Sequence, residues 1–312
     1  MKRIPPIEQI KSPTAILTSD WHLREDVPVC RTDNFLDAQT NKLKFIKHLQ
    51  IKWNCPVLIS GDIFHAWKPS PFLLSWTIEN LPNNVILIPG QHDLPQHSID
   101  LLYKSGICVL EKAEKVKILS EGEYIEITTI KDSIIRIYGF PFGSNLISAE
   151  KEDGIVKVAL IHELTYSKKI PYPDCKLDNA EKLLKRLKNW DLIVVGDNHQ
   201  SFEVELDDRK LISPGSLSRQ TADQIDFRPR VYLWYADTNT VEPVYIPIED
   251  GAVSRDHLIR KQERDDRLEA FVSKLNNDWE GTVSFEENLE RLMKENEIGD
   301  KIKEIVYKAV EI

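Results

Sequence analysis

Carboxylate and imidazole side chains gather in five short segments, and each segment directly follows an apolar run. Side chains of these two kinds are common ligands of divalent metals. Two such metals about 3.5–4 Å apart clamp a phosphate group and activate water. One segment alone is more often structural, but five in order predict a shared two-metal site for phosphate ester hydrolysis. The segments hold five of the eight histidines: Asp20-Trp21-His22, Gly61-Asp62-Ile63-Phe64-His65, Gly90-Gln91-His92-Asp93, Ile161-His162-Glu163 and Gly196-Asp197-Asn198-His199.

Continuous apolar runs that alternate with helical patterns are typical of sheets whose two faces are both covered by helices. We therefore expect an α/β fold, a four-layer α/β/β/α sandwich of two mixed sheets. Helices are expected near residues 35–49, 72–78 and 183–187. Strands are expected at 15–17, 57–59, 85–88, 124–129, 134–139, 156–161, 192–195, 201–205, 209–213 and 231–236.

The order of strands and polar segments places the site. Ligands of open α/β sheets gather beyond the carboxyl ends of the strands, so we expect the five segments to share one rim. The glycines before Asp62, Gln91 and Asp197 permit the tight turns that direct a ligand back into the site.

The composition changes after Ile248, which predicts two domains, 1–248 and 249–312. Residues 255–268 are rich in both charge signs, and a solvated helix face is expected there rather than a DNA-binding surface. Apolar spacing at 268–275 and 302–309 and the capping box Ser284 to Glu287 predict a small, mostly helical module.

The bulk composition bounds the function. The net charge of −9 excludes passive DNA binding through a generally basic surface, so bound metal and local patches such as Arg228-Pro229-Arg230 must offset it. Four cysteines without a C-x-x-C pair, no signal peptide pattern and no long apolar run predict a soluble, cytoplasmic protein with no membrane segment.

The five segments resemble the calcineurin-like metallophosphoesterase signature of D-x-H, G-D-x-x-(D/H), G-N-H-(D/E), a lone His and G-H-x-H. Three runs are similar to the SbcD-type nuclease subunits of double-strand-break repair, including archaeal and phage members. They are the run from Thr18 to Leu23, the run from Gly61 to His65 with Pro69-Ser70-Pro71, and Ser213-Pro214-Gly215-Ser216-Leu217-Ser218-Arg219. This resemblance covers about residues 14–235.

The resemblance implies a role for each site residue. Metal one would be held by Asp20, His22, Asp62 and His199, with Asp62 bridging. Metal two would be completed by Gln91, His162 and Asp197. His92 would contact the scissile phosphate and help to protonate the leaving oxygen, oriented by Asp93, and His65 would assist at the substrate phosphate.

Two residues depart from the family pattern, and both belong to metal two. Gln91 replaces the usual Asn, and Asp197 replaces the first His of G-H-x-H. An oxygen-rich site suits Mn²⁺ or Mg²⁺. We therefore expect two divalent ions, Mn²⁺ first and Mg²⁺ as the alternative, and the competing hypothesis is a weakened or empty second site.

The resemblance also implies partners: DNA, a second copy of the chain in a homodimer, and an SbcC-type coiled-coil ATPase. The tail would be a reduced DNA-contacting cap, the ATPase-docking helices, or both. The first functional hypothesis is a metal-dependent DNA exo- and endonuclease for repair or recombination. The others are a phosphoesterase for a small nucleotide or a phosphoprotein, and a DNA-end-binding scaffold that has lost catalysis.

Overall fold

The computed structural model describes residues 12–129, 133–168, 177–277 and 284–309. The chain divides into two compact units, Met1–Ser254 and Arg255–Ile312. Every helix in the described ranges is too short or too polar to span a lipid bilayer.

The first sheet of the larger unit has six strands in the order β12-β11-β1-β2-β3-β4. The four strands β1 to β4 run parallel to one another, whereas β11 is antiparallel to β1 and to β12. The strand bounds are Ala15–Thr18 (β1), Val57–Ile59 (β2), Val85–Leu87 (β3), Val116–Ile118 (β4), Arg230–Tyr235 (β11) and Thr240–Tyr245 (β12).

The second sheet also has six strands, in the order β5-β6-β7-β8-β10-β9. Its four central strands are parallel, and the two outer strands β5 and β9 are antiparallel to their neighbours. The strand bounds are Tyr124–Thr128 (β5), Ile134–Phe140 (β6), Ile155–His162 (β7), Leu192–Gly196 (β8), Phe202–Leu206 (β9) and Arg209–Ser213 (β10).

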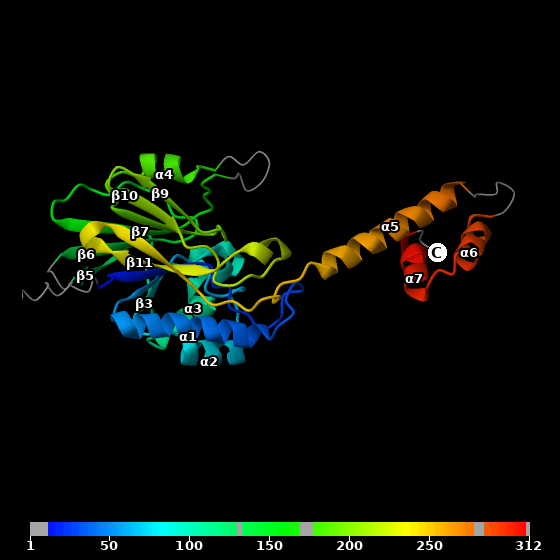
Figure 1. Cartoon of the computed structure of the whole chain (residues 1–312), viewed down its shortest axis with the longest axis horizontal. Coiled ribbons are helices and arrows are strands. Elements are labelled where there is room, and N and C mark those ends of the chain that lie inside the picture. Colours follow the sequence, from blue (N-terminus) through cyan, green and yellow to red (C-terminus); the bar gives the residue numbers. More distant parts are fainter. Residues whose placement is uncertain (1–11, 130–132, 169–176, 278–283, 310–312) are drawn as a thin grey trace, which may run out of the picture. The chain divides into compact units, whose positions relative to one another are not determined.

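Helices cover the outer face of each sheet (Figure 1). The first sheet packs against α1 (Phe35–Trp53), α2 (Pro71–Asn80) and α3 (Gly106–Lys112), and the second packs against α4 (Ala180–Arg186). Short 3-10 helices complete the unit at Gln91–Asp93, Pro95–His97, Ile99–Lys104, Ala222–Asp226 and Ala236–Thr238.

Alternating side chains along each strand build the separate cores. In β1, Ile16 faces the helices, whereas Leu17 faces the second sheet and packs in one cluster with Val158 and Val194. All four of these side chains are fully buried. The two sheets therefore stack face to face, which confirms the predicted α/β/β/α sandwich. Among the α-helices and strands, α3, β4 and β12 were not predicted, and neither were the 3-10 helices.

The smaller unit is helical, as predicted for the end of the chain. It consists of α5 (Asp256–Asn277), α6 (Phe285–Glu295) and α7 (Asp300–Ala309). Phe271 of α5 packs with Leu289 and Met293 of α6. Ser284 and Glu287 form the predicted capping box at the start of α6.

A lysine of α1 is buried beside two arginines. Lys42 is 5% exposed. The nearby Arg31 donates from Nε to Oδ1 of Asp33 over 2.8 Å. Burial, and then repulsion from Arg31 and Arg219, lower the pKa of the Lys42 ammonium from 10.5 to about 7. The fold therefore disfavours the charged form of this side chain.

Replacing Lys42 should change the pH dependence of stability. Between pH 7 and about 10 the unfolded chain binds the Lys42 proton more tightly, so this residue makes stability rise with pH. Below pH 7 the ammonium is charged in both states and its burial cost is complete. Lys42→Met should therefore stabilise the protein most near pH 6 to 7 and least near pH 10, measured by urea unfolding. Lys44→Met, at an exposed position of the same helix, is the control; an equal gain at both pH values in Lys42→Met contradicts the explanation.

Candidate metal centre

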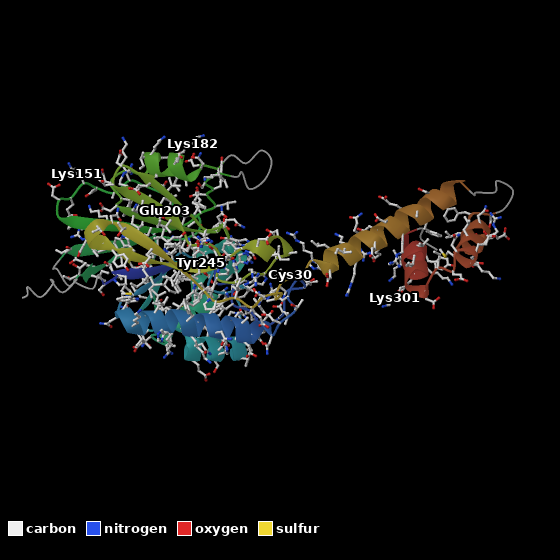
Figure 2. The ribbon with its side chains drawn as sticks, in the orientation of Figure 1. Cys30, Lys151, Lys182, Glu203, Tyr245 and Lys301 are labelled. Atoms are coloured by element: carbon white, nitrogen blue, oxygen red, sulfur yellow. The ribbon has the colours of Figure 1, made fainter. Side chains whose placement is uncertain are left out.

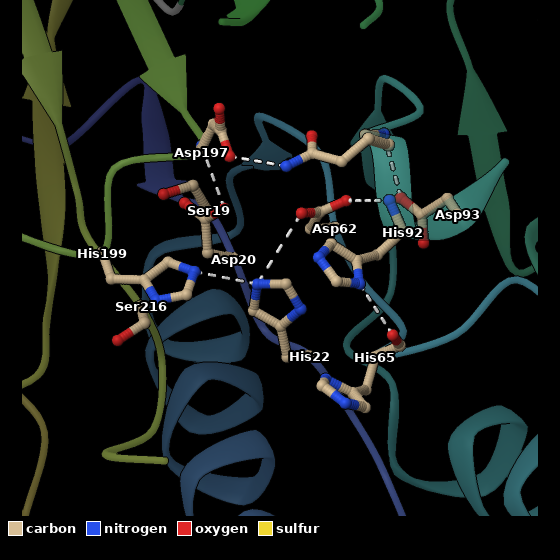
Figure 3. A network of polar contacts seen from close by, with 12 residues as sticks. Ser19, Asp20, His22, Asp62, His65, His92, Asp93, Asp197, His199 and Ser216 are labelled. Carbon is tan, nitrogen blue, oxygen red and sulfur yellow. Dashed lines mark hydrogen bonds and ion pairs between the residues drawn. The ribbon is translucent and has the colours of Figure 1, made fainter. Parts of the chain in front are cut away.

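The five polar segments meet at one rim, as predicted, because the strands before them run parallel within each sheet. Figure 3 shows residues of the segments after β1, β2, β3 and β8. The first sheet supplies the segments after β1, β2 and β3, and the second supplies those at the ends of β7 and β8. Side chains that are up to 179 residues apart in the sequence, from Asp20 to His199, are thereby brought into one cluster.

Asp62 lies at the middle of this cluster and is fully buried. Its Oδ1 accepts a hydrogen bond from the backbone N–H of His92 at 2.9 Å. Its Oδ2 lies 3.7 Å from Nε2 of His22 and 3.4 Å from Nε2 of His162, without a hydrogen bond to either. One carboxylate oxygen thus faces histidines from both sheets, as a bridging ligand must.

Asp20, His22 and His199 form the group predicted for metal one together with Asp62. Their ligand atoms all lie within 4.8 Å of one another. The two imidazole nitrogens Nε2 of His22 and His199 are only 3.0 Å apart. Two imidazole nitrogens this close together suit a shared cation once neither carries a proton.

The second group joins Asp62 to His162 and, again, to Asp20 within the same 4.8 Å limit. Asp20 thus lies close to both predicted metal positions, although the family resemblance implied it for metal one alone. Gln91 and Asp197 contact each other: the Gln91 Nε2 donates to Oδ1 of Asp197 over 2.5 Å. The longer amide and the carboxylate, the two departures from the family pattern, are therefore paired, and the Gln91 Oε1 is left over as an oxygen donor.

Buried atoms without hydrogen-bond partners mark the centre. Unpartnered buried polar atoms are rare in proteins and destabilise the fold. Within the described residues, five of the ten such side-chain atoms belong to predicted metal ligands: Asp20 Oδ2, His22 Nδ1, Asp62 Oδ2, Gln91 Oε1 and His162 Nε2. This donor set of carboxylate, imidazole and amide oxygen fits divalent cations.

In the protein alone, a bound proton supplies the positive charge at this centre. Burial disfavours the charged form of His162, but the facing Asp62 carboxylate overrides it and raises the pKa of His162 to about 10. Burial likewise opposes ionisation of Asp62, yet His162 and His22 hold the pKa of Asp62 well below its usual range. Burial raises the pKa of Asp20 to about 6. A bound cation must displace the His162 proton, because metal ligands bind deprotonated.

The backbone is forced into unusual turns at these ligands. Asp20, His22, Asp62 and Asp197 all have left-handed φ values, of 49°, 45°, 54° and 74°. Non-glycine residues rarely adopt this region, and where they do the surrounding structure must hold them. Backbone hydrogen bonds between the first two segments supply that support, with His22 N donating to Asp62 O over 2.9 Å.

Glycines allow the segments to approach closely. A Cβ atom at Gly90 would lie 2.2 Å from Oδ1 of Asp62, and one at Gly61 would lie 2.1 Å from Nδ1 of His162. Both distances are far below contact, so these positions admit no larger residue without displacing a ligand.

His92 and His65 line the side of the cluster beyond His22. The Nδ1 of His92 lies 2.9 Å from the carbonyl oxygen of His65, and their rings stack with centroids 5.6 Å apart. His65, His92 and His22 also bring their ligand atoms within 4.8 Å of one another. The contact with His65 leaves Nε2 of His92 as the ring nitrogen available to a substrate.

The predicted role of Asp93 differs from its observed contacts. Its buried carboxylate accepts backbone N–H bonds from Ile63, Phe64 and Gly90, and none from the His92 ring. The His65 carbonyl therefore takes the orienting role predicted for Asp93. Asp93 instead joins the loops after β2 and β3, and burial, reinforced by Asp62, raises the pKa of its carboxyl group to about 7.

Two contacts that support the ligands were not predicted from the sequence. The carbonyl oxygen of Ser60 lies 2.6 Å from Nδ1 of His162 and so directs the Nε2 of that ring toward Asp62. The Gln220 Nε2 donates to the carbonyl oxygen of His22 over 3.0 Å. Every residue has a backbone carbonyl group, so residue types do not show which one acts as an acceptor. Only the glycines next to Ser60 and Asp197 indicated such close packing.

Residues 14–201 match the sequence profile of the calcineurin-like phosphoesterases. The chain belongs to this family. This calcineurin-like phosphoesterase is therefore a metal-dependent hydrolase of phosphate esters by family, and its centre contains suitable groups of ligands for divalent metals.

Solved structures with a similar fold include an archaeal phosphodiesterase, with 13% identity, a TM-score of 0.39, and coverage of 74% of this chain and 98% of that chain. Another is a protein of Thermus thermophilus named TT1561, with 13% identity, a TM-score of 0.46, and coverage of 76% and 100%. A third is a putative 5'-nucleotidase from Staphylococcus aureus, with 14% identity, a TM-score of 0.43, and coverage of 80% and 58%. No curated protein matches the sequence.

Adding a methyl group at Gly90 should weaken metal binding. A Cβ at Gly90 collides with the Asp62 carboxylate, and changes to residues that support ligands typically lower metal affinity by about 10- to 100-fold. We expect Gly90→Ala to bind Mn²⁺ at least about tenfold more weakly by calorimetry. Gly299→Ala, where a Cβ meets nothing within 4 Å, is the matched control. Unchanged Mn²⁺ affinity in Gly90→Ala would show that Asp62 is not a ligand.

Proposed function

We propose that this phosphoesterase is a metal-dependent DNA exo- and endonuclease subunit of the SbcD type, acting in double-strand-break repair or recombination. The observation that carries the proposal is the position of the segment Ser213–Arg219, one of the three runs that resemble SbcD. Leu217 N donates to the carbonyl oxygen of Asp20 over 3.1 Å, and Ser216 N donates to that of His199 over 3.1 Å. The segment is thus hydrogen-bonded to the backbone of two metal-one ligands.

Each site residue has a role in the proposal. Asp20, His22, Asp62 and His199 would hold one ion, and Gln91, His162 and Asp197 would complete the second with Asp62 between them. Such ions supply positive charge at the scissile phosphate and an activated water. The oxygen donors of Gln91 and Asp197 favour Mn²⁺ or Mg²⁺.

His92 would deliver the proton to the leaving oxygen. Its ring is fixed through Nδ1 by the His65 carbonyl, so Nε2 is held toward the open side of the cluster. His65, stacked on His92, would contact the substrate phosphate. Asp93 would act indirectly by holding the loops that present both histidines.

The proposed assembly is a homodimer that works with an SbcC-type coiled-coil ATPase. The helical unit α5 to α7 is the proposed contact to the ATPase or to DNA. Light scattering of the isolated chain in solution tests the dimer, and a monomer at all protein concentrations would count against it.

A pocket beside metal two favours a second candidate, hydrolysis of a small phosphodiester. The pocket has a volume of about 400 Å³, and its lining includes His162, Asp197, Glu163 and Phe142. This volume is within the range of small-ligand sites. A nucleotide-sized ester could therefore be bound next to the ligands His162 and Asp197.

Assays with two substrates separate these candidates, and replacing His92 tests its proposed role. His92→Ala should reduce Mn²⁺-dependent degradation of linear duplex DNA by about 100-fold or more, because general acid catalysis contributes about 10²- to 10⁴-fold. His48→Ala, an exposed histidine of α1, should leave the rate unchanged. Hydrolysis of bis(4-nitrophenyl) phosphate is followed in parallel. If the unmodified protein hydrolyses this ester but degrades no DNA, the second candidate replaces the nuclease.

A further inference from the structure

A second pocket begins one residue beyond the metal ligand His199. It has a volume of about 380 Å³, and its lining includes Gln200 and Ser201 together with Arg228, Arg230 and Tyr245. None of these residues belongs to the metal centre or to its proposed catalytic groups.

Two arginines stack on one tyrosine in this pocket. The guanidinium carbons of Arg228 and Arg230 lie 5.1 Å and 4.6 Å from the ring centroid of Tyr245. Arg230 and Tyr245 are directly opposite each other in the β11–β12 ladder, so strand pairing fixes their contact. β12 is the edge strand of the first sheet, and Tyr245 is 46% exposed (Figure 2).

The positive charges of this stack have no ion-pair partner among the described residues. Arg230 donates a long hydrogen bond from Nε to Arg228 O at 3.4 Å, and its guanidinium also hydrogen-bonds to the side chain of Tyr232. A guanidinium that stacks on a ring keeps the N–H groups at its edge free, and these match the geometry of a phosphate. The pocket thus presents the exposed Arg228 guanidinium and the remaining N–H groups of the half-buried Arg230, in a protein whose net charge is −9.

The acidic residues of the pocket narrow the class of ligand. Asp223 and Asp226 line the same pocket, so its two carboxylates balance its two guanidiniums in number. A small, highly charged anion gains little binding free energy in a pocket whose net charge is close to zero. A ligand that carries both a phosphate and an aromatic base gains from the guanidinium edges and from stacking, which is how single strands bind without sequence preference.

We propose that Arg228, Arg230 and Tyr245 form a binding site for a single nucleic-acid strand that leads into the metal centre past His199. The arginines contact two backbone phosphates, and the stack that they form with Tyr245 supports a base. This inference rests on the proposed nuclease function and specifies that the substrate reaches the metals as a separated strand on this side.

The same chain offers a matched control. Arg136 lies over Tyr124 at 5.3 Å, and Tyr124 is also 46% exposed. Tyr124 lies on the outer strand β5 of the second sheet and Arg136 on its neighbour β6, and Arg136 is ion-paired with Glu126 and Glu152. Because its charge is already neutralised and it lines neither pocket, it should contribute nothing to binding of the strand.

The test is binding of fluorescent single-stranded oligothymidylate to the full chain in a His92→Ala background, at several salt concentrations. Each phosphate contact on a single strand contributes about 0.7 to the slope of log affinity against log salt. Arg228→Ala with Arg230→Ala should therefore reduce the slope by about 1.4 and weaken binding at low salt. Tyr245→Ala should weaken binding about tenfold with little change in slope. Arg136→Ala and Tyr124→Ala should bind like the parent.

Further variants keep the result interpretable. Arg228→Ala alone changes an exposed side chain and should lower the slope by about 0.7, even if the double variant does not fold. Tyr245→Phe keeps the ring and should bind normally. An unchanged slope in Arg228→Ala, or equal losses in the Arg136 and Arg228 variants, overturns the site.

The hydrolysis assays separate this failure from that of the nuclease proposal. If the unmodified protein degrades DNA but the Arg228 and Tyr245 variants bind oligothymidylate like the parent, only the strand site is wrong. If it degrades no DNA and binds no oligothymidylate, both proposals fail. The Arg136→Ala and Tyr124→Ala variants should hydrolyse bis(4-nitrophenyl) phosphate at the parent rate, since their stack lines neither pocket.

Discussion

The Asp62 carboxylate faces His22 from its own sheet and His162 from the other, and neither histidine gives it a hydrogen bond. Around it lie the buried oxygen and nitrogen atoms of Asp20, Gln91 and His162, which also lack partners. Groups of this kind repel one another, or gain no favourable interaction, unless a positive charge lies between them. In the protein alone that charge is a proton on His162, whose pKa is raised to about 10. The architecture around the centre serves to hold this costly arrangement together.

Packing of the two stacked sheets offsets the free-energy cost of burying these unpartnered polar atoms. Parallel strands place their carboxyl ends side by side, so the turns after β1, β2 and β8 lie close enough to hydrogen-bond to one another. These turns contain the left-handed residues Asp20, Asp62 and Asp197. The unfavourable backbone is fixed by bonds between segments, for example from Asp197 N to Oδ1 of Asp20 at 3.0 Å. The fully buried side chains of Leu17, Val158 and Val194 between the sheets keep the two halves of the centre in register. A rigid interior is therefore a condition for the metal chemistry.

Much of this arrangement could be predicted from the sequence, because it follows from strands and what comes after them. Apolar runs identify β1, β2 and β3, and Asp62 or His92 just beyond them must reach the same rim. β4 was missed because the exposed Lys117 interrupts its short apolar run, and β12 because Pro243 and its exposed side chains do not resemble a core strand. The bond from Gln91 to Asp197 and the contact of His92 with the His65 carbonyl depend on tertiary geometry. Residue types do not encode such contacts. The pairing of Asp93 with His92 was implied by the family resemblance, and the observed contacts of both residues differ from it.

The most direct test of this account is anomalous diffraction from a crystal of the full chain soaked in Mn²⁺. Two manganese peaks about 3.5–4 Å apart, one on each side of the Asp62 carboxylate, are the predicted result. The first should be bounded by His22 and His199 and the second by His162, Gln91 and Asp197. A crystal saturated with Mn²⁺ that shows no peak beside Asp62, or only one, would contradict the claim that these side chains are arranged around a pair of cations.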